Sequence, residues 1–446
     1  MNILTLLASQ LEKPGGLWST LINWLHGGIG NFGWTVLLVT IFVKIIVSPL
    51  EFITKLNSKK QTLIQQKCAP QVAKIQKKFG KDTQSIRVQT NALYKREGLT
   101  MGVSCLFMII HLVISLTIFM TFYSSLNKNS AYQTIYQFEQ LSTVYTNKNY
   151  ELLKDKNDEI DGYTISTDDE AKKFINEFNI GLKLTQLIEA EKKSDITLSE
   201  DKITYYTDLY EKNKDIVQTI TNESINAVIA KWKDVKSTWL WVDNIWVSDS
   251  TIYPFPVYEN FMEIISSGGY GQYIEEYAKS LNEQSPENVL PEEDTTAYQS
   301  SFKDYYNTVA SIVNSKGGRK KNGYFILAIL AAVITYLSQV LTERSSKKLK
   351  NEKAKLVAQD PNGSSMQVSM KVMKFLLPVI MVTFVLRSSA SFGIYIFASN
   401  IIAIVINEIS AIIINKITHQ KQLEVEEYLE KEANRLIKKG KLQENK

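Results

Sequence analysis

A single lysine, Lys44, interrupts a long apolar run of the sequence, WTVLLVTIFVKIIVSPLEFI. It lies about ten residues from either end of the run, which places roughly 15 Å of helix on each side. A charge near the centre of a bilayer costs several kcal/mol, and such residues are functional by default. The structural alternative is a lysine whose aliphatic chain reaches the headgroups. We favour a cation that faces a water-filled cavity inside the membrane.

Polar side chains also interrupt the other apolar runs, at spacings that suit one side of a helix. Hydrogen bonding between packed helices explains each of them singly. Together with Lys44 they indicate a shared hydrophilic groove, which is the candidate substrate-binding site. Besides Lys44, the candidate groove residues are His111, Ser115, Gln339, Ser399, Asn400 and Asn407.

Enzymatic chemistry has little support in this sequence. The three histidines, His26, His111 and His419, are too scattered for a metal site. The motifs HExxH and GxSxG and a phosphate-binding glycine-rich loop do not occur. We therefore expect a protein that is not an enzyme and has no catalytic residues, no metal and no cofactor.

The apolar runs that contain these residues have the length of membrane spans. A bilayer core requires about 20 apolar residues per helix. Five runs meet or approach that length, which predicts a mainly α, polytopic membrane protein. The five transmembrane helices are expected at residues 34–54, 102–126, 323–342, 372–388 and 392–415.

The charges predict which segments lie on which side of the membrane. Residues 55–98 carry about eleven basic and two acidic side chains, and residues 343–374 about eight and three. Between them, residues 127–320 hold about 20 basic and 32 acidic side chains. Since positive loops stay in the cytoplasm, the N-terminus and the acidic block should lie outside. The expected parts are an extracytoplasmic N-terminus (1–33), a cytoplasmic hairpin (55–101), an extracytoplasmic domain (127–322), a cytoplasmic loop (343–371) and a cytoplasmic tail (416–446).

Residues 55–101 are expected to form a mobile, basic helical hairpin. Gly80 offers a helix stop and Asp82 a helix start, while Pro70 should kink or restart the first arm. Its tip should contact cytoplasmic factors. Electrostatic contact with RNA and ordinary positive-inside charge are both open interpretations of this segment. The candidate contact residues are Lys77, Lys78, Phe79, Gly80 and Lys81.

The extracytoplasmic parts are also expected to be mostly helical. Apolar residues between Leu17 and Leu25 fall on one helical face, which indicates a helix lying on the bilayer within a retained N-terminus. In the acidic block, segments such as AKKFINEFNIGLKLTQLIEAEKK suit helices, whereas KITYYTDLY allows a strand. Its tyrosines and acids could form a binding surface or the ordinary face of a soluble domain.

The first membrane part resembles the YidC family of insertases, which includes the mitochondrial Oxa and chloroplast Albino proteins. In GWTVLLVTIFVKIIVSPL a cation precedes a Pro-Leu pair by five residues, and Lys44 stands where the family normally has arginine. The stretch from Lys59 to Gly98, ending in LYKREG, is similar to the family's cytoplasmic hairpin. SCLFMII resembles the start of the next span, with Phe107 in place of the usual proline.

The second membrane part resembles the same family. MKVMKFLLPVIMVTFVL and GIYIFASN are similar to its last two spans, although Ser389 to Ser391 replace the usual Pro-Ala-Gly turn. WLWVDNIWVSD, from Trp239, resembles a short outer motif of the family. That match would make roughly residues 130–236 an insertion.

The resemblance implies a multi-pass protein of the bacterial cell membrane that inserts nascent membrane proteins and helps them fold. A groove open to the cytoplasm and to lipid would admit the polar tail of a substrate, which Lys44 would attract. Besides these substrates and the lipid bilayer, the implied partners are the ribosome, signal-recognition targeting factors and the Sec translocon, with no DNA. The leading alternatives are a transporter or channel that uses Lys44 as an ion or substrate site, and a receptor or scaffold acting through the outer block.

Overall fold

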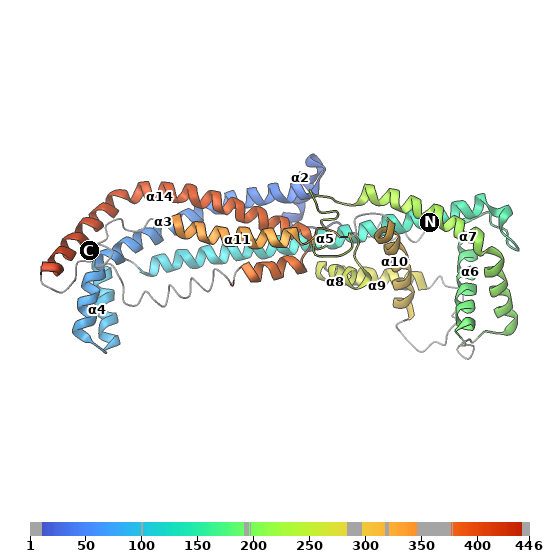
Figure 1. Cartoon of the computed structure of the whole chain (residues 1–446), viewed down its shortest axis with the longest axis horizontal. Coiled ribbons are helices and arrows are strands. Elements are labelled where there is room, and N and C mark those ends of the chain that lie inside the picture. Colours follow the sequence, from blue (N-terminus) through green and yellow to red (C-terminus); the bar gives the residue numbers. More distant parts are fainter. Residues whose placement is uncertain are drawn as a thin grey trace. The chain divides into compact units, whose positions relative to one another are not determined.

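The computed structural model describes residues 11–99, 101–190, 196, 198–282, 297–316, 321–345, 376 and 378–438. These residues are mainly α-helical (Figure 1), and within them an isolated β-bridge joins Trp239 to Val242. The chain divides into two compact units. The first, called here the outer unit, comprises residues 1–33, 124–325 and 388–391; the second, the membrane unit, comprises 34–123, 326–387 and 392–446.

Long apolar helices dominate the membrane unit. Within the described ranges, three helices are long and apolar enough to cross a membrane: α3 (Phe32–Phe79), α5 (Met101–Asp155) and α14 (Ala390–Lys438). Shorter apolar segments are found in α11 (Ile326–Ser345) and in the helix at residues 378–387. At most 28% of the most apolar stretch of each long helix is buried. Since such exposed apolar surface is stable in lipid but not in water, this is a multi-pass membrane protein.

Within the membrane unit, helix α14 contacts α5, α11 and the helix at residues 378–387. Its Tyr395 ring lies 4.9 Å from the ring of Phe122 on α5, centroid to centroid. At Gly393 an added Cβ would lie 3.3 Å from Val385 and 3.4 Å from Leu327 of α11. The glycine therefore permits a close approach between helices, as small residues do in membrane proteins.

A hairpin extends from the first span without a break in the helix. Helix α3 continues through Pro49 and Pro70 to Phe79, so the span and the first arm of the hairpin are one element. Gly80 then takes a left-handed conformation (φ +57°), which favours glycine. The Asp82 carboxylate accepts a hydrogen bond from the Ser85 amide at 3.0 Å and caps α4 (Thr83–Arg96).

The two arms of the hairpin are held by apolar packing and polar contacts. Cys68 and Val72 of α3 are buried with Leu93 of α4 and the nearby Leu99. Lys67 Nζ lies 2.7 Å from Glu97 Oε2, and this ion pair lowers the pKa of the Glu97 carboxyl.

The end of α14 packs along the first arm of the hairpin. Leu63 of α3 is buried with Val425, Leu429 and Ala433 of α14. Lys74 Nζ also lies 2.6 Å from Glu432 Oε1, whose side chain is only 10% exposed. The α14 helix therefore does not end with its apolar stretch but supports the hairpin.

In the outer unit, aromatic side chains from several helices form a core. It includes Phe138 of α5, Trp232 of α7 (Glu200–Val235), Phe261 of α8 (Tyr258–Gly268) and Tyr306 of α10 (Ala297–Lys316). The Tyr306 hydroxyl donates a 2.7 Å hydrogen bond to the Pro256 carbonyl. Helices α2 (Leu17–Ile29) and α9 (Gly271–Asn282) also belong to this unit.

A second core lies farther along α5 and α7, where they meet α6 (Asp168–Glu189). Phe174 and Phe178 of α6 are buried there with Leu209 of α7. A Cβ at Gly181 would lie 2.1 Å from the Tyr206 carbonyl oxygen, so only glycine allows α6 and α7 to approach this closely. We call this part, residues 150–223, the distal lobe.

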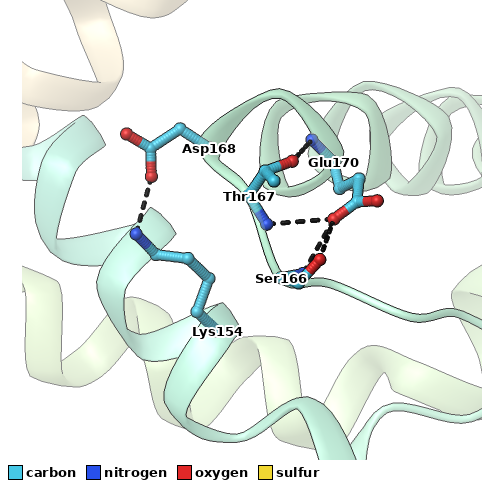
Figure 2. A network of polar contacts seen from close by, with 5 residues as sticks. All are labelled: Lys154, Ser166, Thr167, Asp168 and Glu170. Atoms are coloured by element: carbon cyan, nitrogen blue, oxygen red, sulfur yellow. Dashed lines mark hydrogen bonds and ion pairs between the residues drawn. The ribbon is translucent and has the colours of Figure 1, made fainter.

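A capping box starts α6 (Figure 2). The Glu170 amide donates to Thr167 Oγ1 at 3.2 Å, and the Glu170 carboxylate accepts from the Thr167 amide at 2.9 Å. Ser166 also donates to this carboxylate from its amide and its hydroxyl. These bonds lower the pKa of Glu170 to about 2.

Several helices extend beyond the ends expected from the apolar runs. Helix α5 continues to Asp155 and α14 to Lys438, whereas spans were expected to end at residues 126 and 415. The stretch 202–210, for which a strand was an alternative, lies in α7, because its buried Tyr206 and Leu209 are three residues apart. Of the expected fourth span, residues 372–375 and 377 lie outside the described residues, as do residues 346–371 of the cytoplasmic loop.

Candidate functional site

Lys44 shares one face of α3 with two other charged residues. Side chains seven and eleven positions along a helix return to within about 20° of the starting direction. Glu51 and Lys55 occupy these positions, and all three side chains are partly buried. Lys55 lies within electrostatic range of Lys44, and its Nζ is 3.7 Å from Glu51 Oε2. The face therefore carries a line of charge in the order plus, minus, plus.

The two lysines of this line differ in their partners. Lys55 donates a hydrogen bond to Asn407 Oδ1 of α14 in addition to its contact with Glu51. Lys44 has no hydrogen bond or ion pair to any residue that the structure describes. Lys55 is thus partly neutralised, whereas the charge of Lys44 is available to another group.

Three candidate groove residues have a buried polar atom without a partner among the described residues. These atoms are His111 Nε2 and Ser115 Oγ on α5 and Gln339 Nε2 on α11. His111 and Ser115 are four residues apart and lie on one face of α5. Since an unpaired buried polar group costs about 1–3 kcal/mol, each site favours a partner that can hydrogen-bond.

The remaining candidates line α14. Asn400 donates from Nδ2 to Thr335 Oγ1 of α11 at 3.1 Å, and Gln339 is one helical turn from Thr335. Asn407 lies seven residues from Asn400, on the same face, and accepts from Lys55. Ser399 is hydrogen-bonded to Tyr395. The polar stripe of α14 therefore connects α11 with α3.

The structure brings some of the candidate groove residues into contact with other polar groups and leaves others apart. Asn407 and Asn400 are tied to α3 and α11, but no described contact joins Lys44 to His111, Ser115 or Gln339. The sequence analysis missed Glu51 and Lys55. Their spacing of seven and eleven residues from Lys44 was the available signal, but they fell at the edge of the apolar run. Among the described residues no three His, Cys, Asp or Glu side chains gather as metal ligands would.

The candidate contact residues of the hairpin lie at its tip. Lys77, Lys78 and Lys81 are exposed, and the Lys78 ammonium is 5.4 Å from the centroid of the Phe79 ring. This cation–π contact covers part of the Phe79 ring. The tip thus presents a compact basic surface.

The tryptophan-rich segment around Trp239, residues 238–251, forms a hydrogen-bonded cluster with Asn322 and residues 389–391 in the outer unit. We call this cluster the hub. Asn322 donates from Nδ2 to the carbonyls of Asn244 and Ser248, at 2.8 and 3.0 Å, and accepts from the Asn244 amide at 2.7 Å. The first amides of α14 bind the same segment, because Ala390 and Ser391 donate to the carbonyls of Val247 and Ile245.

Asn31 of the chain before α3 also donates to the hub, at the Thr238 carbonyl. The hub therefore bonds to Asn31, which precedes α3, and includes Asn322, which precedes α11, and the first residues of α14. It contains the Ser389–Ser391 turn, whose two serine hydroxyls lie 2.6 Å apart.

These features define the class of protein. It is a polytopic helical membrane protein with a lysine in an apolar helix, polar groups that have no partner among the described residues, and a basic hairpin. Residues 24–166 match the model of the family described as 60Kd inner membrane protein. This part of the chain is therefore similar to the YidC/Oxa family of membrane protein insertases.

Individual relatives agree with the family match. The chain is 31% identical over 111 residues to the membrane protein insertase YidC of Wolinella succinogenes, covering 25% of this chain and 20% of that protein. The YidC of Paracoccus denitrificans is 34% identical over 86 residues (19% and 13%). That of Caldanaerobacter subterraneus is 31% identical over 94 residues (21% and 44%). The matches thus span less than half the length of each relative, and no solved structure matches the chain significantly.

Proposed function

We propose that this protein inserts nascent membrane proteins into the bilayer and assists their folding. The observation that carries the proposal is Lys44, a cation within an apolar helix that has no partner among the described residues. Such a charge is stable only where water or an anionic group reaches it. A hydrophilic groove, open to the cytoplasm and to lipid, would meet that need.

The mechanism is one of solvation and involves no bond chemistry. The polar tail of a substrate enters the groove, where water and the groups of His111, Ser115 and Gln339 replace part of its hydration. Lys44 attracts acidic residues of the tail. A unit pair at 4 Å is worth about 1 kcal/mol in water and about 4 kcal/mol at an effective dielectric constant near 20. The apolar segment of the substrate then moves into lipid, which stabilises it by about 0.8 kcal/mol per CH₂.

The orientation of the protein follows from its charges. With the basic hairpin and the C-terminal tail in the cytoplasm, residues 127–322 lie outside. The hairpin tip is then placed to contact substrates, the ribosome or targeting factors. Cysteines introduced at the tip should react with a membrane-impermeant thiol reagent from the cytoplasmic face alone. Labelling from the outside would contradict this topology.

Insertion by purified protein in proteoliposomes tests the function directly. We expect Lys44→Arg to insert a substrate with an acidic tail, because the charge is kept. Lys44→Ala and Lys44→Glu should slow the insertion of that substrate by about one to three orders of magnitude, since each 1.36 kcal/mol of lost attraction lowers the rate tenfold. Lys55→Ala is the matched control: it removes the same charge from a site already shielded by Glu51 and Asn407, and its effect should be smaller.

Two further measurements separate the proposal from its alternatives. A substrate with a neutral tail should be nearly insensitive to Lys44, because its entry depends on groove water. If folded Lys44→Ala inserts acidic tails at the normal rate, Lys44 is a structural residue. Specific solute flux through the same vesicles, without insertion, would instead indicate a transporter or channel.

A further inference from the structure

Five large apolar side chains are exposed around the hub of the outer unit. Leu240 is 61% exposed, Ile252 62%, Tyr253 39%, Tyr324 47% and Phe325 46%. Their neighbours Trp239, Val242, Ile245 and Trp246 are buried. Buried apolar side chains therefore lie beside these five, which remain exposed.

Three of these residues also have an unfavourable backbone conformation. Leu240, Tyr324 and Phe325 have φ values of +49°, +60° and +62°, in the left-handed region. This conformation costs a residue with a Cβ about 1–2 kcal/mol, and glycine or asparagine would adopt it more easily. Bulky apolar residues are thus kept, at a cost in stability, at positions where they are exposed. Strain of this kind is often linked to function.

Hydrogen bonds join the two segments into one surface. The amides of Gly323 and Phe325 donate to the Asp249 carbonyl, at 3.1 and 3.4 Å, and the Asn322 amide donates to Thr251 at 3.1 Å. The Asp243 amide donates to the Asn322 carbonyl at 3.0 Å. Tyr324 and Phe325 therefore adjoin the loop that carries Leu240 and Ile252.

The chain itself indicates what covers this surface. Phe325 is followed directly by α11, an apolar helix whose Ile329 and Val333 are 60% and 50% exposed. The first amides of α14, another apolar helix, bind the carbonyls of Ile245 and Val247. The surface thus lies where two lipid-exposed helices begin. Tyrosine and other aromatic side chains favour this boundary between headgroups and acyl chains.

We propose that Leu240, Ile252, Tyr253, Tyr324 and Phe325 form an anchor that inserts into the interface of the lipid bilayer. The anchor fixes the hub, and with it the first residues of α11 and α14, at the depth of the headgroups. Its ligand is the lipid surface itself and not a protein partner. This role is independent of the proposed insertion activity.

Depth-dependent fluorescence quenching tests the anchor. In a Cys68→Ala, Cys105→Ala background, Leu240→Cys and Tyr324→Cys are labelled with a polarity-sensitive dye. The full-length protein is placed in vesicles of phosphatidylcholine and phosphatidylglycerol. Tyr205→Cys, a control on α7 that is 49% exposed, reports a water-facing site. Ile329→Cys on α11 reports lipid.

We expect lipids with a shallow nitroxide to quench the dyes at 240 and 324, and aqueous iodide to quench them severalfold less than the dye at 205. Equal iodide quenching at all three sites would overturn the proposal, because the surface would then face water. Protection from both quenchers would also overturn it, since a protein would then cover the surface. Hydrogen exchange of residues 243–253 establishes that each labelled variant is folded.

Discussion

Asn322 stabilises the hub through both of its amide atoms. Its side chain is fully buried and bonds to backbone groups of Asn244 and Ser248. The backbone amide of Asn322 donates to the Thr251 carbonyl. An asparagine side chain offers two donors and an acceptor on one short, rigid group. It can therefore satisfy a loop whose backbone groups have no strand or helix to bond to.

We expect Asn322→Ala to lower the free energy of unfolding of the outer unit by about 3 kcal/mol, because several buried backbone groups lose their partners. Hydrogen exchange of residues 243–253 and a thermal melt in detergent measure the effect. Asn314→Ala is the control. Asn314 bonds both backbone groups of Phe255 but is only half-buried, so water can replace it and the loss should be about 1 kcal/mol. Equal losses of unfolding free energy in Asn322→Ala and Asn314→Ala would contradict a special role for the hub.

At the scale of elements, composition predicted that long apolar helices occur better than it predicted where helices end. A change from apolar to charged residues marks the passage from lipid to water, but the backbone needs no break there. Helix α3 accordingly passes through Pro49 and Pro70, and α14 continues to Lys438. The turn at Gly80 was predictable because a left-handed residue and a capping Asp82 leave a local signature.

Among the candidate groove residues, too, some features could be predicted from the sequence and others could not. Lys44 could be found from sequence because its charge is isolated in an apolar run. The partners of Asn400 and Asn407 could not, because a contact with Thr335 or Lys55 depends on how α11 and α3 pack against α14. Periodicity gives the face of a helix but not the helix that the face meets.

The packing of α14 on the hairpin leads to a prediction for Leu429, which is fully buried between them. Leu429→Ala should cost about 3 kcal/mol locally through the cavity it leaves. Hydrogen exchange in residues 58–79 should rise, and exchange in the apolar stretch of α14 should not. Leu423→Ala, on the same helix but 51% exposed, should change little. If neither variant alters exchange in the hairpin, α14 does not support it.

The capping box of α6 predicts a pH dependence that is confined to the distal lobe. The pKa of Glu170 is lowered to about 2 in the folded lobe, against an ordinary value of 4.5. A lowered pKa stabilises the folded state above about pH 4.5, and that stabilisation is lost as the pH falls towards 2. The protection of residues 168–175, measured relative to the intrinsic amide exchange rate at each pH, should therefore fall over this range. In Glu170→Gln the same residues should exchange faster at neutral pH and depend less on pH; an unchanged pH profile would contradict the assignment.

At the scale of the whole molecule, the described part of the acidic outer unit contains an aromatic core and a separate distal core. The aromatic core contains Phe138 and Trp232, which lie within the expected insertion at residues 130–236. Removing that whole range would therefore destroy the core next to the hub. The distal core uses the end of α5, α6 and the first part of α7. Asn149 and Ser224 mark the boundary between the two cores, where their side chains hydrogen-bond at 3.1 Å.

This boundary allows the distal lobe to be removed cleanly. We expect a variant in which a short Gly-Ser linker replaces residues 150–223 to keep the aromatic core, because α5 and α7 are already adjacent at Asn149 and Ser224. Its insertion rate in proteoliposomes should equal that of the intact protein, since Lys44 and the candidate groove residues are untouched. Excision of 130–236, the control, should unfold the outer unit, which loss of protection around Phe261 and Tyr306 would reveal. If the shorter excision folds but no longer inserts substrates, the distal lobe takes part in the core function, and a receptor or scaffold role for it gains support.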